Sequence, residues 1–175
     1  ADDAFTPESL SAKVTVLEQF PEIIFVYGDV VYCDEKLSPG KVLLKGDDTD
    51  LLKNLLRWES TPLPLSCGNV LARRVVFDKG FRFDTKLSTA ADQDFSFYIA
   101  HHYKGRHLDL VSTKYRVLPG SMSRNIAVME KDHLRVYQKA AENGLFTDNA
   151  FRRACFGRLY LTLAGSWWVN GNNKL

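Results

Sequence analysis

Three acidic clusters contain the residue types that could carry out chemistry in this chain. They are the pair Asp2-Asp3, the sequence DDTD at residues 47–50 and the sequence DQD at residues 92–94. Carboxylates hold divalent cations, because hard cations prefer oxygen ligands, and a carboxylate can also accept the proton of an attacking hydroxyl group. Metal-assisted transfer of a group to a hydroxyl acceptor needs both functions, supplied by different parts of the chain.

Each cluster also has a purely structural explanation. Asp2-Asp3 is expected at the carboxyl end of a strand, where open α/β sheets bind ligands, but an Asx turn or a helix cap explains the pair too. Residues 47–50 lack the glycine and the distal glutamate of a calcium loop, which favours helix capping. Residues 92–94 open a helix as well, but the small residues at positions 88–91 leave their carboxylates accessible.

The rest of the sequence argues against several other classes of protein and site. The adjacent His101 and His102 face different sides of a helix, so they cannot chelate one metal together. The three cysteines form no CxxC pair, which argues against a zinc site or a disulfide framework and favours a reducing compartment. No apolar run approaches the ~20 residues that span a bilayer, and no aromatic–basic motif of a nucleic-acid reader is present.

The elements that must position the acidic residues follow from hydrophobic periodicity and turn residues. Residues 7–20 are expected to form a helix whose apolar face carries Leu10, Val14 and Leu17. The apolar run at 23–27, which continues to residue 32, is typical of a strand buried on both faces. The other expected elements are a short helix after Asp50, a helix from about residue 73 to Gly80, a helix from residue 92 with Phe95, Ile99 and His102 on its inner side, strands at 107–111 and 113–117, and helices from residue 126 with a break near Gly144.

The order of five short motifs resembles the inverting family 2 glycosyltransferases, whose catalytic domain has the GT-A fold. The motifs are ADDAFTPESL (residues 1–10), PEIIFVYGDVVYCDE (21–35), GNVLARRVVFDKGFRFD (68–84), TAADQDFSFYIA (89–100) and YRVLPGSMSRN (115–125). The resemblance implies an α/β fold with a GT-A-like mixed sheet flanked by helices and a helical C-terminal tail. It also implies that the N-terminal nucleotide-binding half of the fold is missing.

The same resemblance implies the domain organisation and the function. Residues 1–125 would be the second half of the glycosyltransferase catalytic domain, and residues 126–175 a helical C-terminal extension. The enzyme would move a sugar from a nucleotide-diphosphate donor to an acceptor hydroxyl group with inversion, assisted by Mn²⁺ or Mg²⁺. The alternative is a non-catalytic acceptor-binding or interaction module derived from this fold. A metal-dependent nucleotidyltransferase would share the acidic residues.

Site residues follow from the motifs position by position. The implied roles are catalytic base for Asp92, metal binding for Asp2, donor binding for Asp2, Asp3 and Arg116, and acceptor binding for Gly68 and Asn69. Asp94 would be structural or would support the base. Two positions differ from the family pattern, because Ala91 stands where a glutamate is usual and Leu118 where many members have a histidine.

The charge of the chain is divided unevenly along the sequence. Residues 1–103 have a net charge of −5, whereas residues 104–175 have a net charge of +7 and carry the pair Trp167-Trp168. The expected partners are a UDP- or dTDP-linked donor and a glycan or lipid-linked acceptor, without nucleic acid. The basic part favours a phosphorylated or membrane-associated acceptor and a cytoplasmic location that includes the inner face of the membrane. Two ordinary solvated surfaces explain the same asymmetry.

Overall fold

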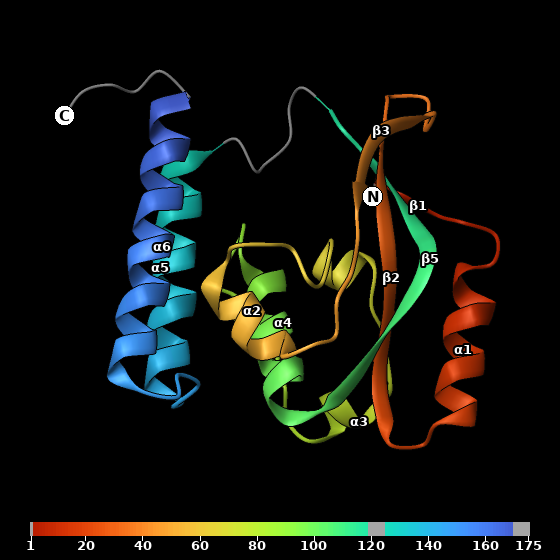
Figure 1. Cartoon of the computed structure of the whole chain (residues 1–175), viewed down its shortest axis with the longest axis horizontal. Coiled ribbons are helices and arrows are strands. Elements are labelled where there is room, and N and C mark those ends of the chain that lie inside the picture. The colour runs from red at the N-terminus through yellow and green to blue at the C-terminus, as the bar shows by residue number, and fades with distance from the viewer. Residues whose placement is uncertain (1, 119–124, 170–175) are drawn as a thin grey trace.

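The computed structural model describes residues 2–118 and 125–169, which form an open mixed β-sheet flanked by helices (Figure 1). Within this part of the chain the sheet has five strands in the order β1-β5-β2-β3, and β4 pairs with β2 beside this path. β2 and β5 are parallel, and the other pairs are antiparallel. The strands are β1 (Ala4–Phe5), β2 (Ile23–Cys33), β3 (Pro39–Leu44), β4 (Leu71–Ala72) and β5 (Lys104–Arg116).

Helices lie on both sides of the sheet. The helix α1 covers one side, and α2, α3 and α4 lie on the other (Figure 1). The helices α5 and α6 run antiparallel to each other and pack on the outer side of α2 and α4 (Figure 1). The helices are α1 (Ser9–Gln19), α2 (Leu51–Arg57), α3 (Val75–Asp78), α4 (Ala91–His102), α5 (Ile126–Glu142) and α6 (Asn149–Val169).

The strand β2 forms the interior of the sheet, as its apolar sequence predicts. Phe25 and Val26 are both 0% exposed, which confirms that the strand is buried on both faces. β5 pairs with β2 along its whole length. The prediction of separate strands at 107–111 and 113–117 is wrong, because register shifts bend one continuous strand there without ending it.

The predicted apolar face of α1 is wrong for two of its three residues. Leu10 and Val14 are 57% and 37% exposed, and only Leu17 is buried. The helix instead turns Lys13 inward, where its ammonium group donates a hydrogen bond to the main-chain oxygen of Asn69 at 2.7 Å. Burial lowers the pKa of Lys13 to about 8. A buried polar contact therefore occupies the inner face of α1, and hydrophobic periodicity does not reveal it.

The turn at the end of α3 agrees with the prediction from the sequence, whereas the predicted inner face of α4 is correct only in part. Gly80 follows α3 with φ of +104°, the left-handed conformation expected of a helix-ending glycine. Phe95 and Ile99 are buried, as predicted. The predicted inward position of His102 is wrong, because its ring packs against Tyr98 at the exposed end of the helix, with centroids 4.4 Å apart.

An apolar cluster joins α2 and α4 to the C-terminal helices. Its buried members include Leu56, Phe97, Tyr137 and Leu159. The predicted helix break lies at Gly144, whose φ is +70°. The cluster crosses the predicted boundary between residues 125 and 126, and the division into two parts stays a prediction.

These observations confirm the α/β class, the mixed sheet flanked by helices and the helical C-terminal part. Among the helices of the described residues, none is long and apolar enough to cross a membrane.

Candidate functional site

A cavity of about 290 Å³ lies at the N-terminal end of α4, where the sequence places the candidate base Asp92. We name it the Asp92 cavity. Its walls come from the end of α2, the loop that follows, α4 and α5, and they include Trp58, Leu65, Thr89, Asp92, Gln93 and His133. α4 runs in the direction opposite to β2 and β5, so its first turn points in the direction in which these two strands run (Figure 1).

Asp92 lies in the first turn of α4 and has an environment suited to proton transfer. The N-cap residue is Ala90, which makes no side-chain cap, and Asp92 Oδ1 accepts a hydrogen bond from the main-chain N–H of Gln93 at 2.8 Å. The side chain of Asp92 reaches solvent, yet the surrounding protein buries the carboxyl group enough to raise its pKa. The N–H of Gln93 and the nearby His133 only partly offset this effect. A carboxylate with a raised pKa is a stronger proton acceptor.

His133 brings a second proton-accepting group to the Asp92 cavity. Its Nδ1 lies 2.7 Å from the carbonyl oxygen of Met129. A carbonyl oxygen only accepts hydrogen bonds, so Nδ1 carries the proton and the neutral ring keeps a lone pair on Nε2. The ring stacks on Trp58, with centroids 4.7 Å apart and planes 10° apart. Burial lowers the pKa of His133, and this favours the neutral ring.

The walls of the Asp92 cavity also contain strained and unsatisfied groups. Trp58 and Leu65 have φ values of 51° and 57°, in the left-handed region that favours glycine. The side-chain oxygen Oε1 of Gln93 is buried without a hydrogen-bond partner among the described residues. Strained backbone and unpaired buried polar atoms lower stability, and they gather at functional sites.

The predicted donor-binding residues lie near the carboxyl ends of β2 and β5, and none of them lines the Asp92 cavity. Asp3 Oδ1 accepts a hydrogen bond from the main-chain N–H of Arg116 at 2.9 Å, so the structure brings these two residues together. Asp2 is exposed beside Asp3. The ring of Tyr32 lies 5.1 Å from that of Tyr115, between centroids. We name these five residues the strand-end cluster.

The guanidinium group of Arg116 is suited to an anionic ligand. Its Nε is buried and has no hydrogen-bond partner among the described residues. Guanidinium groups bind phosphate oxygens through paired hydrogen bonds. Leu118 has no polar group in its side chain, and the remainder of the motif at 115–125 lies partly outside the described residues.

The predicted acceptor-binding residues differ in accessibility. Gly68 is exposed and donates its N–H to the carbonyl oxygen of Leu65 at 2.9 Å. Asn69 is 0% exposed, and its amide group donates to the carbonyl oxygens of Gly28 and Pro64 at 2.6 and 3.1 Å. Asn69 therefore links β2 to the loop that follows α2, and its acceptor-binding role stays a prediction.

The acidic run at 47–50 makes contacts other than the expected helix cap. Asp50 occupies the N-cap position of α2 without a side-chain hydrogen bond. Asp47 instead accepts a hydrogen bond from the N–H of Thr49 at 2.9 Å, and Asp48 accepts one from the N–H of His107 at 3.1 Å. The acidic run therefore stabilises the loop at 47–50 and connects this loop to β5 by a hydrogen bond.

No group of three or more His, Cys, Asp or Glu side chains that could hold a metal occurs in the described ranges 2–118 and 125–169. Mg²⁺ sites at phosphate-bearing substrates commonly have only one or two protein carboxylates, with phosphate oxygens completing the coordination. Asp2 and Asp3 provide two carboxylates for coordination of this kind.

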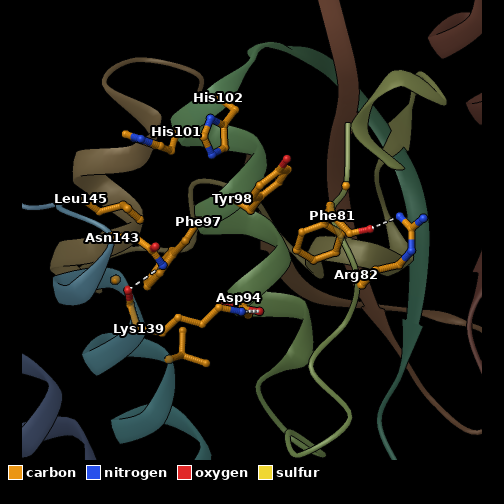
Figure 2. A pocket seen from close by; sticks show the side chains of 13 residues that line it. Phe81, Arg82, Asp94, Phe97, Tyr98, His101, His102, Lys139, Asn143 and Leu145 are labelled. Carbon is orange, nitrogen blue, oxygen red and sulfur yellow. Dashed lines mark hydrogen bonds and ion pairs between the residues drawn. The ribbon is translucent and has the colours of Figure 1, made fainter. Parts of the chain in front are cut away.

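A second cavity, of about 340 Å³, lies on the other face of α4 (Figure 2). It contains Asp94, whose carboxylate is paired with Lys139 at 2.5 Å. Asn143 donates to the main-chain oxygen of Lys139, and Arg82 donates to main-chain oxygens of the segment that precedes it. These polar groups have partners within the protein, whereas Gln93 Oε1 in the Asp92 cavity has none among the described residues. The structure therefore supports a structural role for Asp94.

The structure thus joins Asp3 to Arg116 and surrounds Asp92 with three residues that the sequence did not single out as functional. These residues are Trp58, Gln93 and His133. Only the adjacency of Gln93 to Asp92 was visible in the sequence. No protein-family model matches the chain, and no curated protein matches it. The function is therefore argued from the two sites.

Proposed function

We propose that this chain is part of an inverting glycosyltransferase of the GT-A type, in which Asp92 is the general base. The observation that carries the proposal is the position of the Asp92 carboxylate. It lies on the wall of a cavity of about 290 Å³, where burial raises its pKa. General bases are most effective when their pKa is raised toward the working pH.

The proposed reaction is a single displacement at the anomeric carbon of the donor sugar. The acceptor hydroxyl oxygen forms a bond to that carbon while Asp92 takes the hydroxyl proton. The bond between the anomeric carbon and the diphosphate oxygen breaks, and the diphosphate leaves with the electron pair. Attack from the face opposite to the leaving group inverts the configuration.

The strand-end cluster would bind the nucleotide-diphosphate donor. The buried Nε of Arg116 can donate to a phosphate oxygen, and Asp2 with Asp3 can share a cation with the diphosphate. Mn²⁺ or Mg²⁺ would supply positive charge that neutralises the leaving diphosphate. A UDP- or dTDP-linked donor and a glycan or lipid-linked acceptor in the cytoplasm are the partners that this proposal includes.

The proposal is tested by Asp92→Asn in the full-length protein, with release of UDP or dTDP from nucleotide sugars as the readout. Asparagine keeps the size of the side chain but cannot take the proton, so turnover should fall roughly 10²–10⁴-fold. The affinity for the nucleotide should not change, because Asp92 acts on the acceptor.

The matched control is Asp148→Asn. Asp148 also lies at a helix start, where its carboxylate accepts a hydrogen bond from the N–H of Phe151 at 2.7 Å. The pKa of Asp148 is lowered by that N–H, whereas the pKa of Asp92 is raised. Loss of a helix-start carboxylate alone should leave turnover near that of the wild type. Equal turnover of the Asp92→Asn protein and the wild type would favour the non-catalytic module.

A further inference from the structure

The Asp92 cavity presents three side-chain hydrogen-bond acceptors, while the hydroxyl group of Ser96 is used by the main-chain oxygen of Asp92 and Ser60 and Thr61 are exposed residues. Asp92 presents a carboxylate, Gln93 a buried Oε1 without a partner and His133 the lone pair of Nε2. The hydroxyl group of Thr89 already donates its proton to Asp132 at 3.1 Å. Among the described residues that line the cavity, none is a lysine or an arginine.

A cavity of this kind selects the chemistry of its ligand. Phosphate and carboxylate groups at neutral pH supply few or no hydrogen-bond donors, and the charge of Asp92 repels them. A hydroxyl-rich ligand supplies donors, and each donor satisfies an acceptor that is otherwise desolvated. The walls also contain the apolar side chains of Trp58, Leu65 and Met129, against which the C–H groups of a sugar ring can pack.

We propose that the Asp92 cavity is a binding subsite for a neutral, polyhydroxylated group, with Gln93 and His133 as the residues that determine its specificity. This inference rests on the proposed function, because the bound group would be the sugar of the acceptor that is nearest to the reacting hydroxyl. Its volume of about 290 Å³ suits one small ring of this type. Phosphate groups of the acceptor or donor would bind elsewhere.

The orientation of His133 adds to the proposed selectivity. The carbonyl oxygen of Met129 holds the proton on Nδ1, and the stack on Trp58 fixes the plane of the ring. Burial lowers the pKa of His133, and the hydrogen bond to Met129 together with the nearby carboxylates of Asp92 and Asp132 only partly offsets this. The ring therefore stays neutral near pH 7, and Nε2 accepts a hydrogen bond from a ligand hydroxyl without attracting an anion.

The experiment is a titration of the full-length protein with methyl β-D-glucopyranoside, followed by NMR signals of the His133 and Trp58 rings in the absence of any donor. A parallel titration uses inorganic phosphate. The glycoside should shift both sets of ring signals in a saturable manner, and phosphate should leave them unchanged. Gln93→Met removes one acceptor at nearly constant volume and should weaken glycoside binding roughly two- to tenfold.

Two further variants separate specific contacts from general damage. His133→Phe keeps an aromatic ring against Trp58 but removes Nε2, and it should weaken binding by a similar factor, read from the Trp58 signal. Gln138→Met changes an exposed glutamine on the same helix as His133 and should bind the glycoside like the wild type.

The outcomes distinguish this inference from the proposed function. Absence of a saturable shift through the millimolar range, a shift by phosphate, or unchanged affinity in Gln93→Met would each overturn the subsite. Loss of turnover in Asp92→Asn together with such a result would leave the catalytic proposal standing. Glycoside binding that depends on Gln93 and His133 in a protein without transferase activity would support the subsite and overturn the catalytic proposal.

Discussion

Asn69 provides a test of how the sheet is held together. Its amide nitrogen donates to two buried carbonyl oxygens, those of Gly28 and Pro64, at 2.6 and 3.1 Å. Asn69→Ala would remove the side-chain donor from both carbonyl groups, and it would also remove the acceptor of the Ser112 and Thr113 hydroxyl groups. A buried polar group that loses its partner costs about 1–3 kcal/mol, so the free energy of unfolding should fall by roughly 2–6 kcal/mol. Lys13 should contribute less to this loss of stability, because its ammonium group keeps its 2.7 Å hydrogen bond to the main-chain oxygen of residue 69.

This loss is large compared with the free energy of unfolding of a typical domain, roughly 5–15 kcal/mol, so urea denaturation followed by circular dichroism should detect it easily. Asn143→Ala is the matched control. Asn143 is exposed and donates to one carbonyl oxygen at 2.9 Å, so its replacement should change the free energy of unfolding by no more than about 0.5 kcal/mol. An Asn69→Ala protein as stable as the wild type, with weakened acceptor binding, would refute the structural role and favour direct ligand contact.

Two further predictions concern titratable groups near the Asp92 cavity. Burial alone would raise the pKa of Asp132, but the N–H groups and hydroxyl of residues 88–89 hold it below its usual value. A lowered folded-state pKa stabilises the protein above the unfolded-state pKa of about 3.9. The difference in unfolding free energy between wild type and Asp132→Asn, measured in urea, should therefore be largest near pH 7 and should shrink as the pH falls below about 3.9. An equal difference at pH 7 and below about pH 3.9 would contradict this. Cys67 is exposed as a residue, but the surrounding protein desolvates its thiol, and this burial followed by the charge of Asp92 raises the pKa of Cys67 to about 12. Asp92→Asn should therefore accelerate alkylation of Cys67 by iodoacetamide at pH 8, and an unchanged rate would show that the two groups do not interact.

Local patterns in the sequence were sufficient for much of the fold. The strand at 23–27 was predictable because a continuous β-branched and aromatic run is stable only where both faces of a strand are buried. Gly80 and Gly144 were predictable as helix ends because glycine adopts positive φ without a Cβ penalty. The position of Asp92 in the first turn of α4 also follows from its local sequence, although its proton affinity does not.

Tertiary packing decided the features that sequence patterns misplaced or missed. The inward side of α1 depends on the bond between Lys13 and Asn69, which are 56 positions apart in the chain. No local periodicity records such a bond, because its free energy comes from satisfying buried polar groups that other segments supply. The apolar residues Leu10 and Val14 were therefore placed on the wrong side.

The Asp92 cavity depends on tertiary structure in the same way. Asp92 was visible from its motif, but Trp58 comes from the end of α2 and His133 from α5, and neither carries a local signal of function. Their rings meet only after the apolar cluster packs α2 against the C-terminal helices. The sequence by itself therefore determined most of the helices, the central strand and one candidate base. The three-dimensional packing determined which groups surround that base, because pKa, burial and hydrogen-bond satisfaction are properties of the assembled environment.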